Sequence, residues 1–351
     1  MLEKNYNLVY NKPHHIISEE IQLQKEVQNP VTVFRSDGRV KGSWSKNPIL
    51  KFNTKNYKSA KKIDHRQCFS AENDNCSLYV TLEKAGIEFI VKVVLLDKNT
   101  LITLCDSVVK KYVLSKRKMP DLLSDKILFE DKRVKIAVTT QGENKHLRCQ
   151  FNNFANRDTL YFDFTFSKKD GESLNLSVPF KNTKNFYFKG FSPNFSVSGK
   201  ADLGDKSYIL SDAYGYCDST SYVLPYRQIY KYVTAFCNVN GKDFALYLGS
   251  KLGDDLSGEE NCYFYNRNIM KLSKIKFLGT DERIDKNWSF KAGINAVDVT
   301  FKPKEEYSEP IFTKCDKTTI VYGSLYGEFN LVDNEPVILT DVPAMMFYTV
   351  I

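Results

Sequence analysis

The sequence LYFDFTF at residues 160–166 decides the class of fold. Leu and Phe occupy every second position of this stretch, and Tyr, Asp and Thr fill the positions between them. Successive side chains of a β-strand point to opposite faces of a sheet, so a period of two predicts a strand with one buried face. The same alternation recurs at 134–138, 174–180 and 297–301. The chain is therefore expected to be rich in half-buried strands.

Turn signals between these runs predict β-hairpins. Asn-Gly favours a tight hairpin turn because both residues tolerate a positive φ. The three predicted turns are Ala85-Gly86 between 78–84 and 87–96, Asn240-Gly241 between 230–239 and 242–249, and 169–172 between 160–166 and 174–180. Gly323 and Gly327, in the strand-like run 320–331, mark a bend or a close approach of another backbone.

Helical periodicity is scarce, and one short piece within 106–115 is the best candidate for a helix. Closely spaced strands without intervening helices predict an all-β fold of two consecutive antiparallel β-barrel or sandwich domains, with little helix. We place the domain boundary in the polar stretch 181–185. The predicted organisation is an N-terminal extension at 1–28, an N-terminal β domain at 29–183 and a C-terminal β domain at 184–351.

The charge distribution gives no sign of a nucleic-acid partner. The net charge is +8, but lysines are spread along the chain and alternate with Asp and Glu. A nucleic-acid-binding protein would gather its positive charge on one face or stretch. The densest basic stretch contains Lys110, Lys111, Lys116, Arg117 and Lys118. We interpret it as a solvated surface rather than a phosphate-binding site.

The cysteines and the chain's apolar runs predict a cytoplasmic protein. None of the eight cysteines forms a C-x-x-C pair, and we interpret them as buried free thiols. No N-terminal apolar segment typical of a signal peptide is present, which favours a reducing compartment. The apolar run 87–96 is too short to span a bilayer, so no integral membrane segment is expected.

Cofactor motifs are absent from the sequence. It contains no G-x-G-x-x-G, no G-x-x-x-x-G-K-[ST] and no G-x-S-x-G. The four histidines, His14, His15, His65 and His146, are too few and too scattered to predict a metal site. His65 could act as a general base, but a surface histidine is the favoured interpretation. We expect neither a cofactor nor a metal.

Several short motifs, taken in order, resemble a known family. They are Asp37-Gly38-Arg39, Phe186-Tyr187-Phe188-Lys189, Tyr214-Gly215-Tyr216-Cys217-Asp218, Val223-Leu224-Pro225-Tyr226 and Glu260-Asn261-Cys262-Tyr263-Phe264-Tyr265. From about Asn29 to Val332 the chain resembles the bacterial domain of unknown function 2804 family. That family has no established activity. The stretch 219–224 departs from it, because such proteins usually carry Trp, Gly and Arg there.

The resemblance suggests a distant kinship with two-domain lipocalin-like proteins, which include carotenoid hydratases and some cyclases. It implies a lipocalin-like version of the predicted all-β fold.

A small β-barrel has room for one apolar ligand, oriented by a few polar groups. Tyrosine suits the wall of such a pocket because its ring is apolar and its hydroxyl is polar. The predicted ligand-binding residues are Tyr214, Tyr216, Tyr222, Tyr226, Asn261 and Tyr263. Alternatively, the tyrosine rings fill the core or the surface between the domains.

Asp218 and Glu260 are the candidate catalytic residues. A carboxyl group in an apolar cavity has a raised pKa and can protonate an alkene or a leaving group. The alternative roles are structural: Asp218 would accept backbone N–H bonds at a turn, and Glu260 would satisfy a strand end or pair with Arg227 or Arg267.

Three functions remain open at this point. The first is a barrel that binds a hydrophobic small molecule, such as a lipid or isoprenoid. If this barrel is an enzyme, the expected chemistry is cofactor-free, acid-promoted hydration, isomerisation or cyclisation. The second is a non-enzymatic structural or interaction protein with a packed interior. The third is a carbohydrate-active β-sandwich, which ranks last because Trp44 and Trp288 are the chain's two tryptophans. The sequence gives no oligomeric state.

Overall fold

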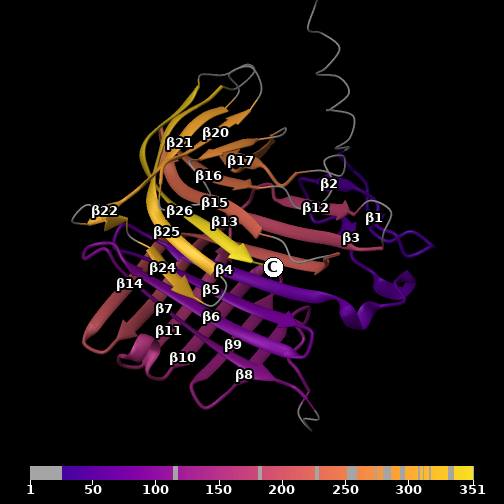
Figure 1. Ribbon diagram of the computed structural model, residues 1–351, viewed down its shortest axis with the longest axis horizontal. Coiled ribbons are helices and arrows are strands. Elements are labelled where there is room, and N and C mark those ends of the chain that lie inside the picture. Colours follow the sequence, from indigo (N-terminus) through magenta and orange to yellow (C-terminus); the bar gives the residue numbers. More distant parts are fainter. Residues whose placement is uncertain are drawn as a thin grey trace, which may run out of the picture.

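The computed structural model describes residues 26–113, 118–180, 184–225, 229–250, 259–272, 275–279, 286–292, 297–306, 309–310, 312–315, 318–330 and 336–350. These residues form a nearly all-β protein of two curled antiparallel sheets (Figure 1), which confirms the predicted class of fold. Helical structure in the described part of the chain consists of three short 3₁₀ turns: η1 (Thr54–Asn56), η2 (Ala60–Lys62) and η3 (Phe154–Asn156). The predicted helix within 106–115 is wrong, because Asp106 to Lys111 belong to a strand.

The first sheet has twelve strands. Along its main path the order is β7 (Ile102–Lys111), β6 (Glu88–Asp97), β5 (Cys76–Ala85), β4 (Asp64–Glu72), β14 (Lys206–Val223), β13 (Phe186–Leu203), β11 (Leu160–Lys168), β10 (Asn144–Phe151), β9 (Val134–Gln141) and β8 (Lys126–Glu130). Off this path, β12 (Leu174–Pro179) pairs with β13 and with β2 (Ser43–Ser45). A small parallel pair, β1 (Val31–Thr32) and β3 (Leu50–Lys51), lies outside this sheet.

The second sheet has ten strands. Its main path is β18 (Asn268–Lys271), β17 (Cys262–Tyr265), β16 (Lys242–Gly249), β15 (Ile229–Val239), β26 (Val337–Val350), β25 (Thr318–Phe329), β21 (Val297–Pro303), β20 (Trp288–Ala292) and β19 (Lys276–Gly279). β24 (Phe312–Cys315) pairs with β25, and β22 (Glu305–Glu306) pairs with β23 (Glu309–Pro310).

Two of the three predicted hairpins are confirmed, β5–β6 and β15–β16. At the second turn Asn240 and Gly241 have φ of 53° and 75°, as an Asn-Gly hairpin requires. The third predicted hairpin is wrong, because β11 and β12 do not pair with each other. Both pair with β13, which has 18 residues and is long enough to run beside first one and then the other. Alternation identified these strands, but it carries no information about which strand pairs with which.

Glycine in β25 permits a close backbone contact. Gly327 has a φ of 131°, and a Cβ placed there would lie 2.0 Å from the carbonyl oxygen of Asp298 on the neighbouring strand. This confirms the interpretation of the glycine in the run 320–331 as a site of close approach.

The sheets change later in the chain than the predicted domain boundary. β13 and β14 lie beyond residue 183, yet both pair with strands of the first sheet. The second sheet begins with β15 at Ile229. The division at 183/184 stays a prediction about folding units, but it does not coincide with the change of sheet.

Buried side chains form three large clusters. The first interior lies on the inner face of the first sheet and includes Phe69, Val91, Leu147 and Phe164. The second interior includes Leu246, Phe290, Val299 and Val321 of the second sheet. A third cluster, called the seam here, joins the outer face of the first sheet to the second sheet and includes Tyr79, Phe191, Tyr247 and Phe347. In Figure 1 the orange and yellow strands of the second sheet lie against the purple and magenta strands of the first.

The cysteines follow the prediction in part. Cys68, Cys76, Cys149, Cys217, Cys237 and Cys262 are free thiols. Cys105 is disulfide-bonded, so the prediction is wrong for that residue. Among the described residues, no helix is long and apolar enough to cross a membrane.

Candidate functional site

A buried lysine lies at the centre of the seam. On β13 the alternation places Tyr187, Lys189 and Phe191 on one face, and this face meets the second sheet. The Lys189 side chain is only 2% exposed. A buried ammonium group is unfavourable unless it is paired and hydrogen-bonded, so Lys189 requires buried anionic partners.

Lys189 binds two carboxylates from distant parts of the chain. Its Nζ lies 2.6 Å from Asp218 Oδ2 and 3.1 Å from Glu260 Oε2. It also donates a hydrogen bond to the Tyr247 hydroxyl at 2.6 Å and lies 3.9 Å from the centroid of that ring. Burial lowers the pKa of Lys189, but Asp218 and Glu260 outweigh burial and hold that pKa above its ordinary value. Lys189 is therefore a fixed cation at neutral pH.

The two sheets bring these carboxylates together. β14 pairs with β13 so that Asp218 lies opposite Phe191, and the Thr220 hydroxyl donates to Asp218 Oδ1 at 2.9 Å. Glu260 immediately precedes Asn261 and β17 of the second sheet and is 5% exposed. Its Oε1 atom is buried and accepts no hydrogen bond from any group in the part of the chain that the structure describes. Such an atom is unfavourable unless a water or a ligand donates to it.

Tyrosine hydroxyl groups complete the polar network. The Tyr230 hydroxyl donates to Glu260 Oε2 at 2.8 Å and lies 3.0 Å from the Tyr247 hydroxyl. Further along the seam the hydroxyls of Tyr79 and Tyr232 lie 3.1 Å apart. Burial raises the pKa of Tyr230 and Tyr247 well above 10, so both are neutral hydrogen-bond donors. We call Lys189, Asp218, Glu260, Tyr230 and Tyr247 the seam cluster.

A small cavity of about 20 Å³ adjoins the seam cluster. That volume is enough for one water molecule. Arg66, on β4, reaches the same cavity. Its Nε lies 3.7 Å from Glu83 Oε2 and makes no hydrogen bond within the ranges that the structure describes. The cavity is lined by Arg66, Cys68, Tyr79, Tyr187, Lys189, Asp218, Thr220, Tyr222, Tyr230, Tyr232 and Tyr247.

The structure brings some of the sequence-predicted residues together. Asp218 and Glu260 meet at Lys189, and Tyr222 lines the same cavity while its hydroxyl donates to Glu83 at 2.9 Å. Tyr216 is in the seam but stacks on Phe236. These residues lie together because β14 and the start of β17 face each other across the two sheets.

Other predicted residues lie elsewhere. Tyr214 borders a separate small cavity beside Phe236. The Asn261 side chain accepts a hydrogen bond from the backbone N–H of Gly249, which joins two strand ends. Tyr263 faces the second interior, against Phe244 and Phe329. Tyr226 lies outside the described residues.

Two alternative sequence interpretations can also be compared with the structure. Arg267 binds Asp243 at 2.9 Å, so the proposed pairing of Glu260 with Arg267 is wrong; Arg227 lies outside the described residues. His65 is partly buried and its Nδ1 lies 2.8 Å from the Ser221 hydroxyl. Burial lowers the pKa of His65 to about 4, which is the direction expected for a packed neutral imidazole.

The sequence analysis missed Lys189 as a site residue, although a signal was present. In the run 186–191 a single lysine occupies the apolar face that also carries Tyr187 and Phe191. A lysine on an otherwise buried strand face requires an anionic partner. Asp218 and Glu260, already candidate site residues, could therefore have been predicted as the partners of Lys189.

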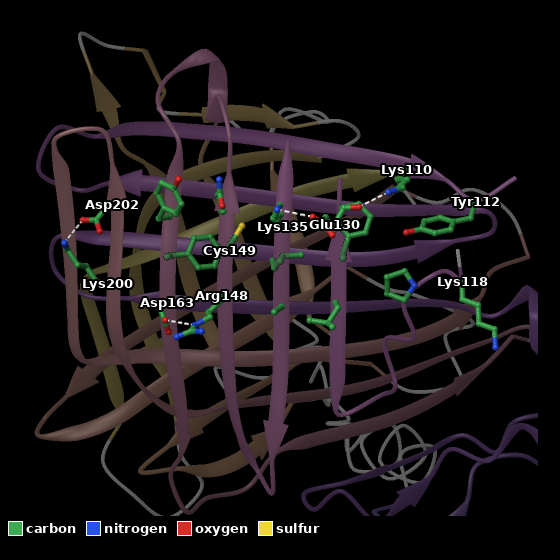
Figure 2. Close-up of a pocket in the computed structure, with 18 residues that line it drawn as sticks. Lys110, Tyr112, Lys118, Glu130, Lys135, Arg148, Cys149, Asp163, Lys200 and Asp202 are labelled. Atoms are coloured by element: carbon green, nitrogen blue, oxygen red, sulfur yellow. Dashed lines mark hydrogen bonds and ion pairs between the residues drawn. The ribbon is translucent and has the colours of Figure 1, made fainter. Parts of the chain in front are cut away.

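A second, larger hollow lies on the outer face of the first sheet, away from the seam (Figure 2). Its volume is about 770 Å³. Figure 2 shows Lys200 and Asp202 at one end and Tyr112 and Lys118 at the other. Among the described residues no group of three His, Cys, Asp or Glu side chains could hold a metal ion.

Comparison with known proteins identifies the family. Residues 24–346 match the domain of unknown function 2804 (DUF2804), so the chain belongs to this family. No protein with a curated description matches the sequence.

Solved structures support the lipocalin-like fold. Kievitone hydratase from Nectria haematococca superposes with a TM-score of 0.54 at 11% identity, covering 82% of this chain and 88% of the hydratase. An AttH-like protein from Nitrosomonas europaea superposes with a TM-score of 0.50 at 10% identity, covering 82% of this chain and 92% of the other. At these identities the similarity establishes the fold, and the chemistry must be argued from the site.

Proposed function

We propose that the seam cluster is a cofactor-free acid–base site that adds water to, or removes it from, an apolar small molecule carrying an alkene. The observation that carries this proposal is the meeting of Asp218 and Glu260 at Lys189, with Glu260 Oε1 buried and without a hydrogen-bond partner among the described residues. The similarity in fold to a hydratase supports the same class of reaction.

The charges of the cluster suit proton transfer. Two ionised carboxylates and one ammonium leave one negative charge in excess, so uptake of one proton makes the cluster neutral. A neutral cluster is favoured in a buried site. That proton would pass to one alkene carbon, water would bond to the other, and the proton lost by water would return to a carboxylate. The balance is one alkene plus one water to one alcohol.

We place the ligand at the seam rather than in a barrel interior. The interiors of both sheets are occupied by buried side chains. The seam instead offers a cavity sized for one water, next to a wall of tyrosine rings. Binding of a larger molecule would require these rings to move apart.

The test is water incorporation into an alkene substrate. Kievitone is the first substrate to offer, followed by isoprenoid alkenes, in ¹⁸O-labelled water with product detection by mass spectrometry. Asp218→Asn and Glu260→Gln are each expected to lower turnover at least about 100-fold, as loss of a general acid or base does. Asp163→Asn, on the outer face of β11, is the matched control and should retain activity. Equal turnover in all four proteins would contradict the proposal.

A non-enzymatic structural role is the second candidate. One observation favours it: every partner of Lys189 comes from a different strand or connection, so the cluster also fastens the two sheets together. If Asp218→Asn and Glu260→Gln lower only the free energy of unfolding, and no apolar molecule is retained in native mass spectrometry of the purified protein, this function is the correct one.

A further inference from the structure

The hollow on the outer face of the first sheet is built from two rows of side chains that cross five strands. Register places Leu128 next to Ala137, Ala137 next to Arg148, and Arg148 next to Asp163. The parallel row runs through Lys135, Gln150 and Tyr161 to Asp202. The volume of about 770 Å³ is in the range of small-molecule sites.

Most of the charges in this hollow are already paired. Arg148 Nε lies 2.7 Å from Asp163 Oδ2, Lys135 Nζ lies 3.0 Å from Glu130 Oε1, and Lys200 Nζ lies 2.9 Å from Asp202 Oδ1. Lys110 donates to the carbonyl of Glu130 at 2.7 Å. These pairs leave little uncompensated charge along the length of the hollow.

Lys118 differs from these paired side chains. It lies at one end of the hollow beside Tyr112, is exposed, and makes no ion pair or hydrogen bond with any part of the chain that the structure describes. It belongs to the basic stretch that the sequence analysis interpreted as a solvated surface. An unpaired cation at one end of an otherwise neutral hollow complements a ligand with one negative charge at one end.

The hollow also exposes apolar surface. The Leu128 side chain next to the Lys118 end is 55% exposed, and Tyr161 toward the other end is 49% exposed. Both point outward from strands whose alternate residues, such as Phe129 and Phe162, are buried in the first interior. A ligand that covered Leu128 and Tyr161 would remove their apolar surface from water.

We propose that this hollow binds an amphiphilic organic anion, such as a long-chain carboxylate, with its acid group at Lys118 and its apolar body across Leu128 toward Tyr161. The site shares no residue with the seam cluster, so it is a second site and does not depend on the proposed reaction. The net charge of +8 favours the approach of an anion.

The first experiment compares two fluorescent probes, 1-anilinonaphthalene-8-sulfonate and its uncharged analogue N-phenyl-1-naphthylamine. Lys118→Gln should weaken binding of the sulfonate about 3- to 5-fold, the size of one exposed ion pair, and leave the neutral probe unchanged. Lys276→Gln, an exposed lysine on β19 with the same change in net charge, should change neither. Equal effects of the two lysine variants would overturn the placement of the acid group.

The second experiment tests the apolar body and the ligand class. Leu128→Ser and Tyr161→Ser should weaken both probes, with unchanged thermal unfolding showing that both variants fold. Dodecanoate should displace the sulfonate probe at a lower concentration than dodecanol. The proposal is overturned if neither probe binds, if both outward-facing variants bind like the wild type, or if acid and alcohol compete equally.

Discussion

The first interior and the seam are both buried, but they are made of different side chains. The first interior is mainly apolar, and β11 alone contributes Phe162, Phe164 and Phe166. The seam contains Lys189, its two carboxylates and a set of tyrosine hydroxyls. Apolar packing is sufficient to hold a curled sheet together, whereas burying three charges is unfavourable for stability alone. The surface between the sheets, rather than either interior, therefore carries the groups expected of a functional site.

The largest expected effect comes from removing the cation of the seam. Lys189→Met leaves two carboxylates buried without their partner and should lower the free energy of unfolding by about 3–5 kcal/mol. Urea denaturation measures this loss. The triple variant K189M/D218N/E260Q removes all three charges and should recover most of the lost stability. A triple variant no more stable than K189M would contradict the charge-pairing account.

A substitution in the first interior should act by packing alone. The Leu147 side chain has no exposed surface, so Leu147→Ala leaves a cavity in the first interior. This change should lower the free energy of unfolding by about 3 kcal/mol. The loss should add to that of Asp218→Asn, since the sites share no contact. The loss from Lys189→Met, in contrast, should be strongly non-additive with Asp218→Asn. If the losses of stability from Leu147→Ala and Asp218→Asn do not add, the proposed distinction between the first interior and the seam is wrong.

A smaller effect is expected for a single hydroxyl of the seam. Tyr230→Phe removes the donor to Glu260 Oε2 and should lower the free energy of unfolding by about 2 kcal/mol, as loss of a hydrogen bond to a charged group does. The control is Tyr263→Phe in the second interior, whose hydroxyl has no hydrogen-bond partner within the described ranges. Chemical denaturation should find the control close to wild type.

An effect of a different kind is a change of stability with pH at the edge of the seam. Lys271 donates to the carbonyls of Glu259 and Asn261, on either side of Glu260. Burial lowers the pKa of Lys271 to about 8, against 10.5 for an ordinary lysine. Between these values the unfolded chain binds more protons than the folded one, so Lys271 makes the free energy of unfolding rise with pH.

Lys271→Gln removes this contribution. The stability of the wild type relative to the variant should therefore increase between roughly pH 7 and roughly pH 10. Urea denaturation of both proteins in the same buffers measures the difference, and other titrating groups cancel. A difference that stays constant or falls with pH would show that burial does not lower the pKa of Lys271.

Local patterns made the strands predictable, while their pairing depended on distant parts of the chain. Alternation identified β11, and Asn240-Gly241 fixed the β15–β16 hairpin, because both signals act between near neighbours. The pairing of β11 and β12 with the same long β13 could not be read from a short window. A short helical period favoured a helix within 106–115, but residues 106–111 belong to β7, and pairing of β7 with β6 overrode that local preference.

The candidate site was predictable in part for the same reason. Asp218 and Glu260 were selected by chemistry, and the structure brings them to one lysine. Their meeting at Lys189 depends on the packing of two sheets, which a single sequence does not encode locally. Asn261 and Tyr263 lie in the same short motif as Glu260, but successive side chains of a strand point to opposite faces, and Tyr263 faces the second interior.

The long ribbon of β13 and β14 has a practical consequence for dissecting the protein. A cut at residue 183 would strip the first sheet of two strands and expose the edges of β4 and β11. A cut between Val223 and Ile229 would leave each sheet whole, yet it would divide Lys189 and Asp218 from Glu260. Two fragments made in this way would act as a split reporter, in which the charged cluster exists only after the halves reassociate.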